Sequence, residues 1–265
     1  MQIPVIAATD RGADADSFWT PAGVESVAHL LAALLWPLII VGLVFQFRRQ
    51  IADALSKTKS LKLPFGLELT VQRELQAAAG DVGSLAGKSD GPTESEIKRA
   101  EAVEALTDKA DISFVKKQAD DLALEYERIR AAMAPGDSRT REMEKVVAKM
   151  RVVGRAAFPL RHELARSVSP GKRLQAIATL QVDPDEDYFL WLAERLKAER
   201  PFVGYHAAVA LVTAANAPDA GRYLPELKRA AEYLRGVEVE LSSDSDRQSL
   251  VRAFIERVNS MERPV

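Results

Sequence analysis

The longest run of apolar positions in the chain extends from Ser26 to Phe47 without a single Asp, Glu, Lys or Arg. An α-helix of about 20 apolar residues is long enough to cross the ~30 Å hydrocarbon core of a bilayer. A helix buried in a globular domain normally keeps a polar face, which this run lacks. Arg48 and Arg49 follow the run directly, whereas a cleaved signal peptide ends in small residues. The pattern therefore predicts a transmembrane helix over residues 26–47.

The charges on either side of this span predict its orientation. Acidic side chains outnumber basic ones in residues 1–25, which we interpret as a short extracytoplasmic tail. Basic side chains crowd the other flank, and cytoplasmic flanks carry the excess of Lys and Arg. We expect these basic residues to contact the anionic membrane surface: Arg48, Arg49, Lys57, Lys59 and Lys62.

Residues 48–75 are expected to form a basic juxtamembrane helix followed by a short β-hairpin or an extended segment. Leu67, Leu69 and Val71 alternate with polar residues after the turn signal Pro64-Phe65-Gly66. The run from Lys62 to Glu68, K-x-P-x-G-x-E, resembles a juxtamembrane pattern of bacterial single-span membrane proteins, which implies no activity. Residues 76–93 are rich in glycine and carry few apolar side chains, so we predict a flexible linker.

A helical hairpin is predicted over residues 94–168. Thr93 and Glu96 have the spacing of a capping box, which opens a helix. Apolar residues at alternating spacings of four and three then form a seam on a helix over Ile112–Met133, and the partner helix runs from Ser138 to about Ser167. The seam suits either packing inside the hairpin or a coiled-coil homo-oligomer; it consists of Val115, Ala119, Leu122, Tyr126, Ile129 and Met133.

The partner helix carries a basic stripe. At 100° per residue, Arg151, Arg155, His162 and Arg166 fall on one side of a continuous helix. Such a face is either simply solvated or meets an acidic partner, such as acidic lipid, a nucleotide or nucleic acid. No aromatic residues interleave with these charges, so nucleic acid is not an expected partner.

Residues 169–265 repeat a helix-turn-helix pattern. Ser169-Pro170 and Pro201 open helices, and the turns Asp183-Pro184-Asp185 and Asn216-Ala217-Pro218-Asp219 interrupt them. At a shift of 32 residues, Ala176, Ile177 and Ala178 fall on Ala208, Val209 and Ala210. The region resembles HEAT or armadillo repeats, a resemblance that implies stacked helix pairs and a surface for binding proteins.

Composition excludes several kinds of chemistry. The chain has no cysteine, which rules out disulfides and thiolate metal sites, and its three histidines lack metal-ligand spacing. The formal net charge of −2 points to no class of partner. The sequence contains no phosphate loop, GxGxxG turn, GxSxG elbow, HExxH motif or kinase signature. We expect neither an enzyme nor a bound cofactor or metal.

These patterns together predict an all-α protein of the inner membrane with a single span, its N-terminus outside and its C-terminal domain in the cytoplasm. The preferred function is a membrane-anchored adaptor or scaffold that contacts lipids and binds a cytoplasmic protein through its helical repeats. The alternative is a self-assembling effector that perturbs or perforates the membrane, with oligomers formed by the span and the seam. Affinity capture of a partner, as opposed to leakage of the membrane, distinguishes the two.

Overall fold

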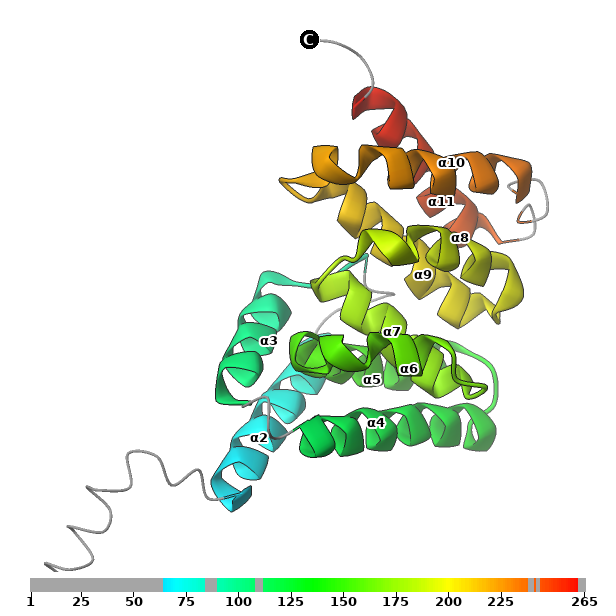
Figure 1. Ribbon diagram of the computed structural model, residues 1–265. Coiled ribbons are helices and arrows are strands. Elements are labelled where there is room, and N and C mark those ends of the chain that lie inside the picture. The colour runs from blue at the N-terminus through cyan, green and yellow to red at the C-terminus, as the bar shows by residue number, and fades with distance from the viewer. Residues whose placement is uncertain (1–63, 84–89, 108–111, 238–240, 242–243, 262–265) are drawn as a thin grey trace, which may run out of the picture. The chain divides into compact units, whose positions relative to one another are not determined.

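A computed structural model describes residues 64–83, 90–107, 112–237, 241 and 244–261 (Figure 1). The predicted transmembrane helix over 26–47, the extracytoplasmic tail and the basic residues Arg48, Arg49, Lys57, Lys59 and Lys62 lie outside these ranges. Within the ranges, no helix combines the length and the apolar composition that a membrane crossing requires.

The described residues are helical, and no strand occurs among them. This confirms the all-α prediction for this part of the chain. The helices are α2 (Pro64–Gly83), α3 (Glu94–Leu106), α4 (Ile112–Ala132), α5 (Asp137–Ala157), α6 (Arg161–Ala165), α7 (Pro170–Val182), α8 (Phe189–Ala198), α9 (Pro201–Asn216), α10 (Leu224–Val237) and α11 (Ser245–Met261). Short 3-10 turns η3 (Phe158–Leu160), η4 (Glu186–Tyr188) and η5 (Ala220–Tyr223) lead into α6, α8 and α10.

The predicted β-hairpin after Pro64 is wrong, because this stretch is the start of α2. Val71, Leu75, Ala78 and Val82 are all buried, at the spacings of four, three and four that mark one face of a helix. Leu69, which the alternating pattern placed with Val71, is 69% exposed. The helix continues to Gly83, so residues 76–83, the first part of the predicted linker, are also helical.

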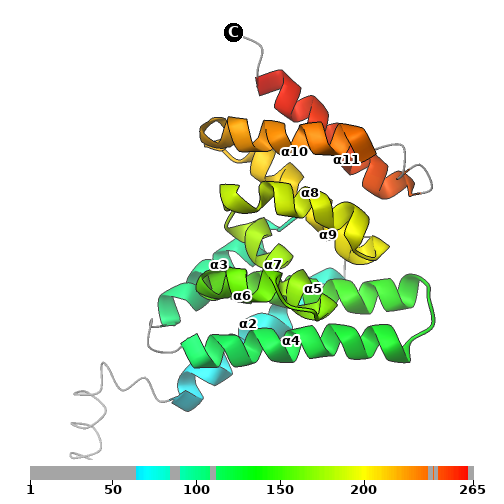
Figure 2. The ribbon, with the colours of Figure 1, turned by 45° about the vertical axis from the view of Figure 1, so that its right-hand side comes forward.

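Helix α5 lies at the centre of the N-terminal half and contacts α2, α3, α4 and α7. Helices α4 and α5 form an antiparallel hairpin, which Figure 2 shows side by side. The seam of α4 faces inward: Val115, Ala119, Leu122 and Tyr126 are at most 4% exposed. These four seam residues are therefore packed within the chain, and the other two, Ile129 and Met133, are partly buried.

Two predicted helix starts are confirmed in atomic detail. Thr93 Oγ1 accepts a hydrogen bond from the Glu96 N–H, and the Glu96 carboxylate accepts one from the Thr93 N–H, which completes the capping box of α3. Ser169 Oγ likewise accepts from the Lys172 N–H, and Pro170 occupies the first position of α7. Both caps satisfy backbone donors that the first turn leaves unpaired.

The C-terminal helices form two layers. Helix α6 packs on α7, α8 on α9, and α10 on α11. Helices α7, α9 and α11 contact one another in turn, and α8 contacts α10 (Figure 1). Ala176, Ile177 and Ala178 of α7 are buried like Ala208, Val209 and Ala210 of α9, so the 32-residue echo relates two neighbouring helices of one layer.

Candidate functional site

An open cleft of about 470 Å³ lies between α6 and α8. Its walls are Arg161, His162, Ala165 and Arg166 on one side, and Asp187, Tyr188 and Trp191 on the other. We call this feature the α6/α8 cleft. It combines aromatic and cationic side chains, a combination that protein surfaces use to hold partners.

Pro159 creates the cleft by ending α5. Proline has no N–H to donate to the carbonyl four residues before it and clashes with that carbonyl, so α5 stops at Ala157. The chain makes the 3-10 turn η3 and restarts as α6. The predicted single helix over 138–167 is therefore broken, and the residues after Pro159 leave the face on which a continuous helix would place them.

Arg161 forms a fixed wall of the cleft. Its Nε donates to Asp185 Oδ2 at 2.5 Å, and Nη1 donates to the Phe158 carbonyl at 3.0 Å. The guanidinium carbon lies 3.9 Å from the centre of the Phe158 ring, a cation–π distance. Asp185 also accepts a hydrogen bond from the Asp187 N–H and so orders the turn η4. Asp185 neutralises the charge of Arg161, so this arginine shapes the wall of the cleft and attracts an anionic ligand only weakly.

The opposite wall is aromatic. The Tyr188 and Trp191 rings meet edge to face with centroids 5.9 Å apart, and both side chains are partly buried. Burial raises the pKa of the Tyr188 phenol, which therefore remains protonated at neutral pH. The Tyr188 hydroxyl lies 3.1 Å from His162 Nδ1, so the imidazole of α6 is tied to the aromatic wall.

Arg166 supplies the free charge of the cleft. It is exposed, and no hydrogen bond or ion pair is recorded for its side chain among the described residues. Asp187 is the acidic side chain lining the cleft, and it lies at the N-terminal end of η4 and α8, where the peptide dipoles offset negative charge. The cleft therefore attracts a ligand with an anionic group that can contact Arg166 and an apolar group that can pack against Trp191.

The four residues predicted as one basic face do not form one. Arg151 is 1% exposed, so its prediction as a surface residue is wrong. Arg155 is paired with Glu101 at 3.0 Å and Glu104 at 3.9 Å on α3. His162 and Arg166 alone meet in the α6/α8 cleft. The physical reasons are the burial of α5 on several sides and the break at Pro159.

Sequence reasoning missed Arg161, Tyr188 and Trp191 as cleft residues. The spacing of Tyr188 and Trp191 places both rings on one face of the helix start, which is a usable signal. Their proximity to His162 and Arg166 depends on α6 turning away from the α5 axis, and no periodicity over a continuous helix reveals that.

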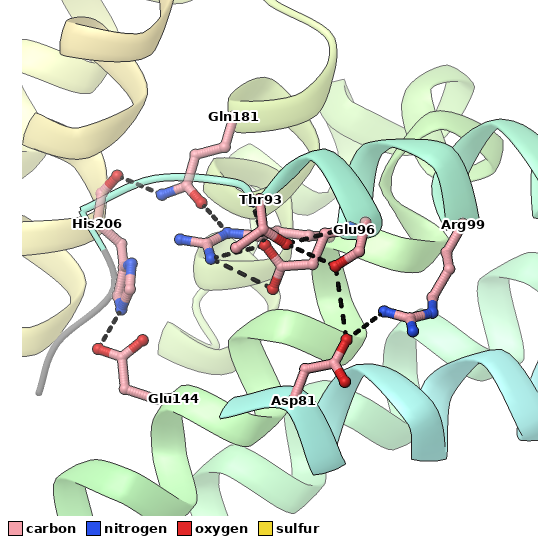
Figure 3. A network of polar contacts seen from close by, with 9 residues as sticks. Asp81, Thr93, Glu96, Arg99, Glu144, Gln181 and His206 are labelled. Carbon is pink, nitrogen blue, oxygen red and sulfur yellow. Dashed lines mark hydrogen bonds and ion pairs between the residues drawn. The ribbon is translucent and has the colours of Figure 1, made fainter. Parts of the chain in front are cut away.

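Arg151 belongs instead to a buried polar network between α3, α5, α7 and α9, in which Figure 3 labels Glu96, Gln181, His206 and Glu144. Its Nε donates to Gln181 Oε1 at 2.6 Å, and Nη1 lies 3.3 Å from Glu96 Oε2. The Gln181 amide donates in turn to the His206 carbonyl at 2.7 Å. His206 Nε2 lies 3.3 Å from Glu144 Oε1, and both side chains are at most 1% exposed.

Glu96, Glu144, Arg151, Gln181 and His206 are at most 3% exposed, so we assign this network to the fold and not to ligand binding. Glu96 completes the capping box of α3 and also pairs with Arg151. These two interactions fix the start of α3 against α5. In the part of the chain that the structure describes, no group of three or more His, Asp or Glu side chains is arranged to hold a metal ion.

Comparison with known proteins does not change this assignment. No family model, no curated protein and no solved structure matches this chain.

Proposed function

We propose that the chain is a membrane-anchored adaptor. In this proposal residues 26–47 hold the protein in the inner membrane, and the helical domain binds the acidic segment of a cytoplasmic protein in the α6/α8 cleft. The observation that supports this proposal most directly is the exposed Arg166 beside a wall formed by Tyr188 and Trp191. Arginine, tryptophan and tyrosine are the side chains that contribute most to protein interfaces.

The two layers of C-terminal helices support a HEAT-like interpretation. Helices α7, α9 and α11 contact one another in turn in one layer, and α8 contacts α10 in the other, as expected for stacked repeats. The helix pairs that pack on each other are α6/α7, α8/α9 and α10/α11. The sequence repeat suggested the pairs α7/α8 and α9/α10 instead. In this frame α6 and α8 belong to the same layer, and the cleft is a gap between adjacent repeats.

The self-assembling effector has less support. It requires the α4 seam to join chains, yet Val115, Ala119, Leu122 and Tyr126 are buried against the same chain. The adaptor does not need these residues to be exposed, so it is the better proposal.

A charge reversal in the cleft tests the adaptor. Full-length protein in mild detergent is used to capture partners, alongside the variants Arg166→Glu and Arg229→Glu. Arg229 is exposed on α10 and has the same charge, so it is the matched control. We expect Arg166→Glu to lower recovery of a specific partner about tenfold, since that change corresponds to ~1.4 kcal/mol, and Arg229→Glu to retain it.

Raising the salt concentration should weaken the wild-type complex, because the attraction is partly between exposed charges. Recovery of only the protein itself and abundant membrane proteins contradicts recruitment. Equal losses from Arg166→Glu and Arg229→Glu contradict the cleft as the binding site.

The proposed topology has its own test. A fluorescent protein that matures only in the cytoplasm and a phosphatase active only in the periplasm are fused separately after Val265. We expect fluorescence without phosphatase activity, because basic residues flank the inner end of the span. Reversing Arg48, Arg49, Lys57 and Lys59 to Glu should mix the two orientations. Phosphatase activity in the wild type would place the helical domain outside and remove every cytoplasmic partner.

A further inference from the structure

A second cavity, of about 480 Å³, lies where α3 ends and α4 begins, against the end of α5 and the C-terminus of α7. Ile112, Ala156, Phe158 and Pro159 give it apolar walls. Glu104, Thr107, Arg155 and Asp183 supply its polar groups. A cavity of this size with mostly apolar walls and a few convergent polar groups is typical of a small-molecule site.

Asp183 is the unusual residue of this cavity. It caps the C-terminus of α7, where the helix dipole disfavours a negative charge. Its side chain is partly buried, and no hydrogen bond or ion pair is recorded for its carboxylate among the described residues. Burial raises the pKa of Asp183, and Arg155 opposes that shift only in part. The ionised carboxylate therefore lowers the stability of the folded state.

The charged side chains that line the cavity among the described residues are negative on balance. Arg155 is the cation that lines it, and this guanidinium already pairs with Glu101 and Glu104. Glu104 also faces the cavity, Asp185 adds negative charge nearby, and Arg161 is engaged by Asp185. The Thr107 hydroxyl donates to the Val103 carbonyl. Among the described residues, no donor in this set is directed at Asp183, so its carboxylate is open to a cationic ligand.

We propose that this cavity binds a small organic amine, with the ammonium group on Asp183 and an apolar body against Phe158, Ile112 and Ala156. The site is separate from the α6/α8 cleft, and the proposal does not depend on the adaptor function. A ligand of this kind joins the ends of α3, α5 and α7 through one ion pair and one apolar contact.

The substitution Asp183→Asn separates binding from folding. Asparagine keeps the size of the side chain and removes the charge that α7 and burial disfavour. We expect the melting temperature at neutral pH to rise by about 1–3 °C. The pKa of Asp183 is raised in the folded state. The ionised carboxylate therefore destabilises the fold at pH values above that raised pKa, and this destabilisation is absent at pH values below the ordinary pKa of an aspartate. The gain should therefore disappear as the pH falls through this window.

Binding is measured by calorimetry on full-length protein in detergent, with phenethylamine and 3-phenylpropionate as probes. The two probes share an aromatic body and carry opposite charges, and every variant meets the same micelles. We expect the wild type to bind phenethylamine and not 3-phenylpropionate. Asp183→Asn should weaken phenethylamine binding at least about tenfold. Asp187→Asn, which removes a carboxylate from the other cleft, should leave it unchanged.

Each remaining outcome overturns the proposal. Equal binding of the two probes removes the role of the carboxylate, and unchanged binding by Asp183→Asn places the amine elsewhere. A melting temperature lowered by Asp183→Asn shows that the carboxylate has a structural partner. Partner capture by the wild type is scored separately. A failure of amine binding therefore does not contradict the adaptor proposal, and a failure of partner capture does not contradict the amine site.

Discussion

Replacing Arg151 with methionine is expected to lower the free energy of unfolding by about 3–5 kcal/mol, the cost of leaving one member of a buried ion pair without its partner. Arg151 and Glu96 are 1% and 3% exposed, so water cannot replace the lost guanidinium. The substitution also removes the donor to Gln181. Urea denaturation of the full chain in detergent, followed by the helical circular dichroism signal, measures the loss.

Arg155→Met is the matched control for this prediction. Arg155 lies one turn later on the same helix and also pairs with glutamates of α3, but its side chain is 29% exposed. Ion pairs of this kind contribute about 0–1 kcal/mol. Adding Glu96→Gln to Arg151→Met should recover part of the loss, since no buried charge then remains unpaired and the amide oxygen still caps Thr93. Equal losses from Arg151→Met and Arg155→Met would contradict the burial of the Arg151–Glu96 pair.

Gly171→Ala is expected to be the second large effect, with a loss of about 3 kcal/mol in the free energy of unfolding, near the upper end for overpacking. A Cβ atom at Gly171 would lie 2.3 Å from the Ala123 carbonyl oxygen and 2.9 Å from its carbon. Both are backbone atoms of α4, so α4 and α7 must move apart to admit a methyl group. The shift would also strain the hydrogen bond from the Gly171 N–H to Glu127.

Gly80→Ala is the opposite case and serves as its control. Nothing lies within 4 Å of a Cβ placed at Gly80 in α2. Alanine is favoured over glycine inside a helix by about 0.5–1 kcal/mol, so this variant should gain stability. The same denaturation experiment measures both, and a Gly171→Ala protein as stable as the wild type contradicts the close approach of α4 and α7.

The sequence predicts helix starts well where a local rule acts within one turn. The capping box at Thr93 and Glu96 and the Ser169-Pro170 start are both found as expected. The inward face of α4 also follows from its spacing alone. The β-hairpin was wrong because Leu67, Leu69 and Val71 form too short a sample. Extending the window to Leu75, Ala78 and Val82 reveals the period of a helix.

The candidate site was harder to predict because it depends on tertiary contacts. A helical wheel treats Arg151 and Arg166 as neighbours on one exposed stripe, but α5 is covered by α2, α3, α4 and α7. Arginine is rarely buried, so its residue type gave no warning. Glu96, the partner of Arg151, was identified only as a capping residue. Nothing in the local pattern indicates that one carboxylate serves both purposes.

The adaptor proposal requires that a cytoplasmic protein docks in the α6/α8 cleft. In-cell photo-crosslinking tests it directly, with a benzophenone amino acid replacing Trp191 in one variant and Arg229 in another. We predict a discrete adduct of one partner from position 191, its loss when Arg166→Glu is added, and no such adduct from position 229. The absence of an adduct from position 191, or the same adduct from both positions, would contradict the claim.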